Sequence, residues 1–170
     1  MRTLIMGKER LQRTLARLAH EVVERNRGAS ELVVFGIARK GIPVAEALAQ
    51  HIRDIEGLDV RAHALDVRPF RDDRESSEAA QTTPSRAVEV TGQHVLLADD
   101  VLFSGRTARA ALDAIVRYGR PASIQLVVLV DRGHREVPIQ ADYVGRTIPT
   151  KHRECVVVEF SDSPCVYIEE

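Results

Sequence analysis

The stretch that most constrains the fold is residues 95–112, which read VLLADDVLFSGRTARAAL. It opens with the apolar run 95–98, which is typical of a buried parallel strand. Two adjacent carboxylates, Asp99 and Asp100, close this strand, and a short loop with a glycine leads into an alanine-rich helical run. A strand, an acidic pair, a tight loop and a helix start together predict an anion site at the carboxyl edge of a sheet.

The start of that helix indicates which anion fits. The backbone N–H groups of residues 104–107, SGRT, are expected to be free and to point the same way. A phosphate can accept from all of them, and the helix dipole favours its negative charge. The acidic pair lies a few residues upstream, where it can accept hydrogen bonds from vicinal hydroxyls. A phosphate and a diol on one small molecule describe a ribose 5-phosphate.

A second turn of the same kind comes earlier in the chain. Residues 32–37, LVVFGI, predict a buried strand, and a helix is expected from about Pro43 to Ile55. Arg39 and Lys40 stand between them, just before a glycine. Two cations at the same sheet edge suit a second anion, namely pyrophosphate, although a solvated turn is the alternative.

The remaining periodic segments complete an alternating pattern of strands and helices. We expect a helix over 8–27, a strand over 60–67, a helix over 107–118, a strand over 124–130 and a β-rich tail with short strands over 155–160 and 165–168. The polar cluster 131–135 follows the strand over 124–130 and would be a third polar group at the same edge. Three strand ends meeting at one edge argue more strongly for a site than any single motif.

Composition narrows the class of protein. A chain of 170 residues with 44% apolar and 29% charged residues is expected to form one soluble domain. No apolar run approaches the roughly 20 residues needed to cross a bilayer, and the N-terminus lacks a signal-peptide pattern, so we expect a cytoplasmic location.

Cys155 and Cys165 match no metal motif and are expected to be free thiols. The net charge of −1 does not indicate a nucleic-acid binder, but it leaves room for a local basic patch.

Four segments carry a resemblance to a known family: RLAHEVVERN (17–26), FRDD (70–73), DDVLFSGRTARAAL (99–112) and GRPASIQLVVLVDRGHREVPIQADYVGRTIPT (119–150). Together they resemble PyrR proteins, which are pyrimidine-operon attenuation regulators and uracil phosphoribosyltransferases of type I. The resemblance implies an α/β fold with a central, mostly parallel sheet flanked by helices, in a single domain over 1–170. It also implies a flexible lid over about 71–90 and a small β-rich hood from the N-terminus and about 141–170.

The activity implied is transfer of a phosphoribosyl group from 5-phosphoribosyl-1-pyrophosphate (PRPP) to uracil, which gives UMP and pyrophosphate. Mg²⁺ is expected as the cofactor, bound mainly through PRPP oxygens and water rather than by a protein cage. Lys40 stands at the family's arginine position in the pyrophosphate loop, where it keeps the charge but loses bidentate geometry.

The resemblance assigns roles to individual residues. The catalytic pair is Asp99 and Asp100, on the ribose hydroxyls. The residues for the 5′-phosphate of PRPP or UMP are Val101, Leu102, Phe103, Ser104, Gly105, Arg106 and Thr107. The residues for pyrophosphate are Arg39 and Lys40, and those for the nucleotide and its base are Arg132 and Val156. Arg71 or Arg74 has a lid role, unless the run 72–75 is simply solvated.

The regulatory role implied by the family requires a surface for the leader RNA of a pyrimidine operon. Candidate RNA-binding residues are Arg17, His20, Arg135 and Arg146. Gln140 and Ala16 depart from the family pattern, which argues against this role. Alternatives are therefore a transferase with no RNA-binding role, or a type I transferase for another base such as a purine. A homodimer or a larger homo-oligomer is expected from the family, and no membrane partner.

Overall fold

The computed structural model describes residues 1–72 and 88–170 and has a five-stranded parallel sheet at its centre. The strands lie in the order β3-β2-β4-β5-β6, and every neighbouring pair is parallel. Their bounds are β2 Leu32–Ile37, β3 Ala62–Leu65, β4 His94–Leu102, β5 Ser123–Asp131 and β6 Tyr143–Thr147. The predicted α/β fold is confirmed.

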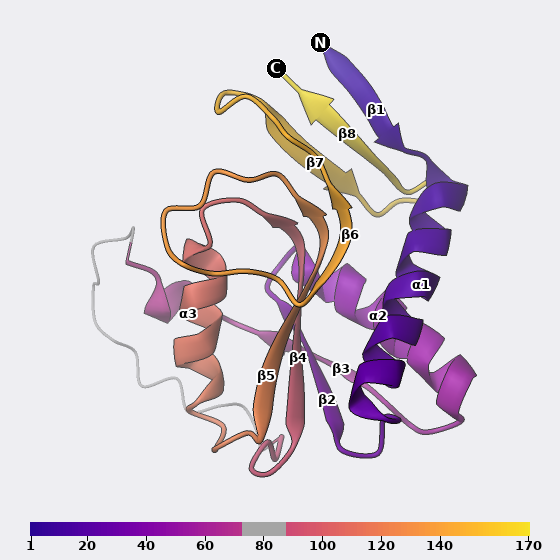
Figure 1. Cartoon of the computed structure of the whole chain (residues 1–170), viewed down its shortest axis with the longest axis vertical. Helices are drawn as coiled ribbons and strands as arrows, with labels where there is room; N and C mark the ends of the chain where they lie inside the picture. Colours follow the sequence, from indigo (N-terminus) through magenta and orange to yellow (C-terminus); the bar gives the residue numbers. More distant parts are fainter. Residues whose placement is uncertain (73–87) are drawn as a thin grey trace.

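Helices cover both faces of this sheet (Figure 1). Helices α1 (Lys8–Asn26) and α2 (Gly41–Glu56) pack on one face, and α3 (Arg106–Ile115) packs on the other. Burial on both faces explains why β2, β4 and β5 read as continuous apolar runs rather than alternating ones. The apolar residues Leu11, Leu15, Leu18 and Val22 lie on one face of α1 and are buried. Helix α3 presents small alanines to the sheet, so that this short helix can lie close to it.

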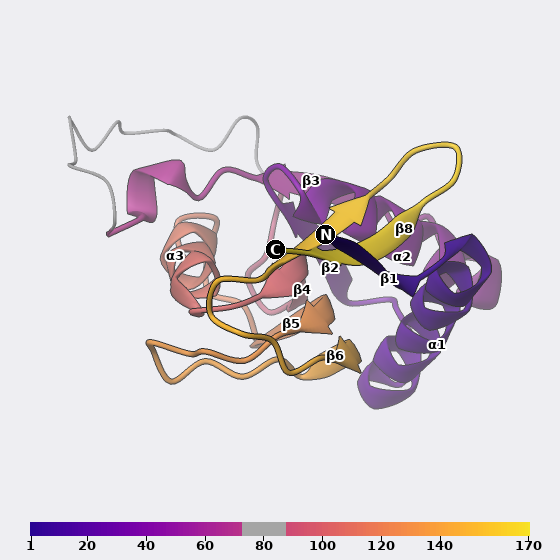
Figure 2. The same ribbon diagram turned by 90° about the horizontal axis from the view of Figure 1, so that it is seen from above.

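A second, smaller sheet forms the hood. It is antiparallel, in the order β1-β8-β7, with bounds β1 Arg2–Met6, β7 Cys155–Glu159 and β8 Cys165–Glu169. It stands above the carboxyl edge of the parallel sheet, and both chain ends belong to it (Figures 1 and 2). The expected hood range of about 141–170 begins too early, because β6 pairs in parallel with β5, from Val127 opposite Tyr143 to Asp131 opposite Thr147.

Several element ends also differ from the prediction. Strand β4 continues through the acidic pair to Leu102, because Asp99 and Val101 still pair with β5. Helix α3 ends at Ile115 rather than at residue 118, and β3 is shorter than predicted. A 3₁₀ turn, η1 (Arg68–Phe70), precedes the lid expected over 71–90, of which residues 73–87, Arg74 included, lie outside the described residues.

Two further expectations concern thiols and membranes. Cys155 and Cys165 are both free, as predicted. Among the helices of the described residues, none combines the length and the apolar character that crossing a bilayer requires.

Candidate functional site

The acidic pair lies at the carboxyl end of β4 with its carboxylates held by the backbone. The Asp100 amide donates to Asp99 Oδ1 at 2.9 Å, and the Val101 amide donates to Asp100 Oδ1 at 2.8 Å. Asp99 is half-buried and Asp100 is buried. Desolvation raises the pKa of Asp99 well above its ordinary value, with a further rise from the charge of Asp100. Burial therefore makes the ionised form of Asp99 costly, and a diol or a sugar cation at this site can stabilise it.

Two cations from other elements oppose that charge. Desolvation also raises the pKa of Asp100, while the Lys40 ammonium acts to lower it. The Arg71 guanidinium acts in the same way on Asp99. The predicted pyrophosphate residue Lys40 and the acidic pair therefore face one site, although they are about 60 residues apart in the chain.

Close packing brings the turn with Arg39 and Lys40 to the acidic pair. Gly41 begins α2 directly against β4, where a Cβ would overlap the Ala98 carbonyl and come within 3.2 Å of the Asp99 Cα. The Ala38–Arg39 peptide bond is cis, and the side chains of Arg39 and Lys40 are exposed. Only glycine at position 41 lets the turn approach so closely.

The loop between β4 and α3 has the geometry of an anion cradle. Gly105 has φ +85°, and its amide precedes the first turn of α3. The Arg106 amide donates a long hydrogen bond of 3.3 Å to Ser104 Oγ. Within residues 1–72 and 88–170, the amides of Ser104, Gly105 and Thr107 donate to no protein acceptor. These amides can therefore bind phosphate oxygens, and the helix dipole adds to the attraction.

The loop is braced from the segment that follows β5. The Ser104 carbonyl accepts the Glu136 amide at 2.9 Å, and Arg135 Nη1 donates to the Phe103 carbonyl at 2.9 Å. These bonds turn the carbonyls away and hold the loop in one shape. Val101 and Leu102, which were predicted to bind phosphate, are the last residues of β4, and their side chains pack against the hydrophobic cores.

The two residues predicted to approach the nucleotide are both buried. Arg132 lies with its guanidinium 4.2 Å from the Phe103 ring centroid. It donates to Thr150 Oγ1 at 3.0 Å and to the Lys151 and His152 carbonyls at 3.1 and 3.2 Å. It therefore ties the hood connection, which is the segment between β6 and β7, to the end of β5. Val156 lies on the buried face of β7.

A ring cluster beside the cradle was not predicted from the sequence. The Phe103 ring meets the rings of His134 and His152 at centroid distances of 5.9 and 5.5 Å, and the two histidines lie 5.3 Å apart. His134 Nε2 also lies 2.7 Å from the Thr150 carbonyl. The 103, 134 and 152 positions belong to three separate loops, so no local pattern could have indicated the cluster.

The candidate RNA-binding residues fall into two groups. Arg17 reaches from α1 to the Gly145 carbonyl of β6 at 2.7 Å, Arg146 donates to the Ile5 carbonyl at 3.0 Å, and His20 is exposed on α1. A hollow of about 370 Å³ on the same helix is lined by Arg10, Arg13, Thr14 and Arg17. Arg135 lies apart, since its guanidinium is engaged by Phe103, Ile139 and Asp131.

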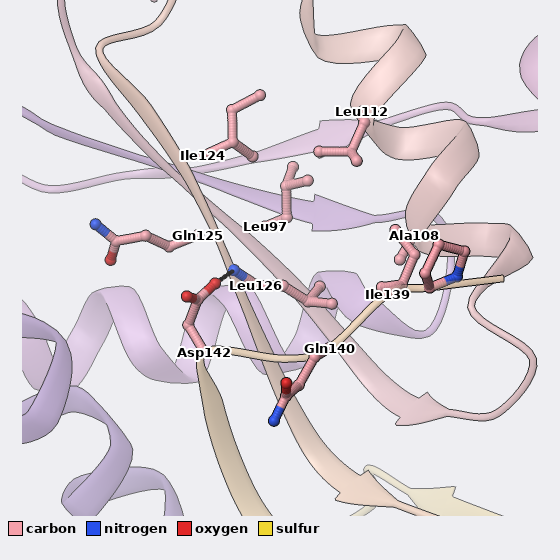
Figure 3. Close-up of a pocket in the computed structure, with 10 residues that line it drawn as sticks. Leu97, Ala108, Leu112, Ile124, Gln125, Leu126, Ile139, Gln140 and Asp142 are labelled. Carbon is pink, nitrogen blue, oxygen red and sulfur yellow. Dashed lines mark hydrogen bonds between the residues drawn. The ribbon is translucent and has the colours of Figure 1, made fainter. Parts of the chain in front are cut away.

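A separate apolar pocket of about 200 Å³ lies between α3, β5 and residues 138–142 (Figure 3). Leu97, Leu112 and Ile124 line its apolar part, while the side chain of Gln140 is turned away from them. Gln140, one of the departures from the family pattern, therefore lies on the rim of this pocket, whereas the arginine hollow is on α1.

A sheet edge with an acidic pair, a phosphate cradle and a facing cation defines a class of protein, the phosphoribosyltransferases. The family model described as "Phosphoribosyl transferase domain" matches residues 7–163. Among solved structures, the hypoxanthine phosphoribosyltransferase of Trypanosoma cruzi has a TM-score of 0.71 and 21% identity, covering 96% of this chain and 95% of its own. A hypoxanthine-guanine phosphoribosyltransferase from Bacillus anthracis has a TM-score of 0.65 and 22% identity, covering 86% and 84%. At these identities the likeness shows the fold alone.

Sequence relatives place the chain more narrowly. It is 50% identical over 160 residues to the bifunctional protein PyrR of Pelotomaculum thermopropionicum, covering 93% of this chain and 88% of that protein. It is 45% identical over 163 residues to the bifunctional protein PyrR of Clostridium kluyveri, covering 95% and 92%. A relative in Lactococcus lactis, 46% identical over 93% of this chain and 90% of its own length, is called a pyrimidine operon regulatory protein. The chain belongs to the PyrR family.

Proposed function

We propose that this protein is a uracil phosphoribosyltransferase that converts uracil and PRPP to UMP and pyrophosphate, and that it also regulates pyrimidine operons through RNA. The observation that carries the enzymatic part is the cradle of amides at residues 104, 105 and 107, which donate to no acceptor in the described part of the chain, close after Asp99 and Asp100. The charge of Lys40 acts on the same pair. Membership of a family whose proteins are named bifunctional supports two roles in one chain.

In the proposed reaction, a uracil ring nitrogen forms a bond to C1′ while the bond from C1′ to the pyrophosphate oxygen breaks. The proton of that ring nitrogen is lost to the departing pyrophosphate or to water. Positive charge develops on the sugar, so the protein contributes mainly position and electrostatics. Asp99 and Asp100 accept hydrogen bonds from the ribose hydroxyls and stabilise the cation. Residues 103–107 anchor the 5′-phosphate, and Arg39 and Lys40 receive the leaving pyrophosphate.

Mg²⁺ fits the donor set of this site as a shared ion. The nearby protein oxygens are the carboxylates of Asp99 and Asp100, each already accepting one backbone hydrogen bond. A hard cation that prefers six oxygens would take the others from PRPP and water. When bound, it neutralises the pyrophosphate and so makes it a better leaving group.

Turnover assays test the enzymatic role. Purified protein is given PRPP and Mg²⁺ with uracil, guanine or orotate, and nucleotide formation is measured. Formation of UMP alone is the expected result. Preferential use of guanine would support a purine transferase, and no product with any base would reject the enzymatic role.

The arginine hollow on α1 favours the second role, which is binding of a pyrimidine-operon leader RNA in response to UMP. Phosphate contacts by several arginines would make the affinity fall steeply with salt. A gel shift with leader RNA should show a complex that UMP strengthens, and Arg13→Gln should weaken it. Failure to form a UMP-dependent complex would leave a transferase without regulatory activity. Light scattering in solution tests the expected homodimer or larger oligomer.

A further inference from the structure

Arg106 lies within the proposed phosphate cradle, but its guanidinium binds two carboxylates outside the loop. Arg106 Nε donates to Glu136 Oε2 at 2.6 Å, and its Nη1 donates to Asp72 Oδ2 at 2.7 Å. Two carboxylates therefore balance its single charge, and they hold the guanidinium outside the loop. A phosphate in the cradle carries nearly two negative charges, so a further cation would stabilise it strongly.

Arg71 lies where such a cation is needed. Its Nη1 donates to Thr107 Oγ1, the hydroxyl at the start of α3, at 3.0 Å. Its charge also acts to lower the pKa of Asp99. The guanidinium is partly buried, and it therefore contacts the start of α3 while its charge is felt at the acidic pair.

The residues on either side of Arg71 fix this position. Phe70, in η1, packs against the core that contains α3. Asp72 is held by its ion pair with Arg106, and Arg109 lies 4.0 Å from the same carboxylate. The backbone of Arg71 is thus held against α3 on both sides. Its side chain is thereby directed toward Thr107.

We infer that Arg71 is a ligand of the 5′-phosphate of the bound nucleotide, and that Asp72 is a positioning residue that aims it. When the phosphate binds, the guanidinium can donate to two of its oxygens through parallel N–H bonds. This inference rests on the proposed function, since it names the phosphate of the same nucleotide. It assigns the cation of the phosphate site to the segment before α3 rather than to Arg106.

Calorimetric titration with UMP tests the role of Arg71 without turnover. Arg71→Gln should raise the Kd for UMP about 10- to 100-fold, because a charge-assisted hydrogen-bond pair is lost. Arg71→Lys keeps the charge but loses the paired hydrogen-bond geometry. Its Kd for UMP should therefore lie between those of the unmodified protein and Arg71→Gln. Arg68→Gln is the matched control, since Arg68 lies in the same turn and, among the described residues, its guanidinium pairs with Asp66 alone. Its Kd should equal that of the unmodified protein.

The KM for uracil separates a phosphate ligand from a general support of the site. Arg71→Gln should raise the KM for PRPP while leaving the KM for uracil within about twofold, and the melting temperature should stay close to that of Arg68→Gln. An unchanged Kd for UMP in Arg71→Gln overturns the inference, as does an equal loss for uracil and PRPP. If the unmodified protein binds no UMP, the proposed function itself fails.

A double-mutant cycle tests Asp72. Asp72→Asn should raise the Kd for UMP less than Arg71→Gln does, and the double variant should be no worse than Arg71→Gln alone. Glu136→Gln is the control, because it also releases one carboxylate from Arg106 but leaves the Asp72 pair intact. Equal effects of Asp72→Asn and Glu136→Gln, or additive losses in the cycle, would show that Asp72 does not act through Arg71.

Discussion

Asp99 provides the sharpest test of how this site is built, because its charge is costly to the folded state. Desolvation and the neighbouring Asp100 raise its pKa, so the ionised form is less favourable in the folded protein than in the unfolded chain. We predict that Asp99→Asn stabilises the protein at neutral pH and suppresses its transferase activity. The asparagine Oδ1 can still accept the Asp100 amide, so the substitution removes the charge and keeps the hydrogen bond.

The expected gain is about 1 kcal/mol, at the lower end of single stabilising substitutions, because Asp99 is only half-buried and water still reaches it. For a domain of this size, that corresponds to a rise in melting temperature of about 2 to 4 °C. The activity should fall about 100-fold, as for removal of one group that stabilises transition-state charge.

The direction of the pKa shift determines how the stability difference between Asp99→Asn and the unmodified protein changes with pH. A carboxyl whose folded pKa is raised loses stability as the pH rises from its unfolded pKa, about 3.9, through its folded pKa. The advantage of Asp99→Asn should therefore be absent near pH 4, increase as the pH rises, and be constant once Asp99 is fully ionised in the folded protein. Thermal unfolding between pH 4.5 and 8 measures this trend.

Asp59→Asn serves as the control, since Asp59 is exposed and its pKa is lowered by Arg61. Its melting temperature should not increase with pH relative to the unmodified protein. If Asp99→Asn is less stable than the unmodified protein at pH 7.5, or if its advantage is the same at every pH, the argument from buried charge is wrong.

Three further substitutions test the packing around the site. Gly41→Ala should cost roughly 1 to 3 kcal/mol by overpacking α2 against β4 and should raise the KM for PRPP. Gly7→Ala, at the N-cap of α1 with open space around it, should cost less than about 1 kcal/mol and leave that KM unchanged when unfolding and kinetics are measured. Gly105→Ala should weaken UMP binding in calorimetry, because φ is +85° and a Cβ would come within 3.0 Å of Val137. Arg132→Lys should cost about 1 to 3 kcal/mol and increase amide exchange over residues 150–152, since lysine cannot reproduce three donated bonds.

The sequence predicts the parallel sheet and the anion cradle because their determinants are local. The acidic pair and the cradle lie in one continuous run, 99–107, with four residues between Asp100 and Gly105. The buried strands β2, β4 and β5 are apolar over most of their length, which separates them from half-exposed strands. The end of β4 lies beyond the predicted apolar run, because backbone pairing with β5 continues past the last apolar residue of that run.

Strand β6 shows where local pattern is insufficient. Its sequence YVGRT is short and mixed in polarity, so it suits an edge of either sheet. Its membership of the parallel sheet depends on pairing with β5 and on contacts with α1, such as the bond from Arg17 to the Gly145 carbonyl. The hood is consequently smaller than the tail of the sequence indicates.

The arginines are the hardest residues to assign from sequence, since each is equally able to bind a ligand or a carbonyl. Arg106 lies inside the phosphate motif, yet it pairs with carboxylates 34 residues before it and 30 residues after it. Arg132 and Arg135, which were predicted to contact nucleotide and RNA, also donate to carbonyls of the hood connection and the cradle. Arg71, for which a lid role was expected, donates to the Thr107 hydroxyl of the cradle.

The contrast between the locally encoded amides and the arginines from distant segments follows from the physics of a preorganised site. The amides that bind phosphate must be near one another in sequence, because a single helix start supplies them. The groups that hold their carbonyls and set their charge must come from outside the loop, because the loop is too short to brace itself. Bracing by Arg135 and Glu136 from beyond β5 therefore matters as much to the cradle as its own glycine.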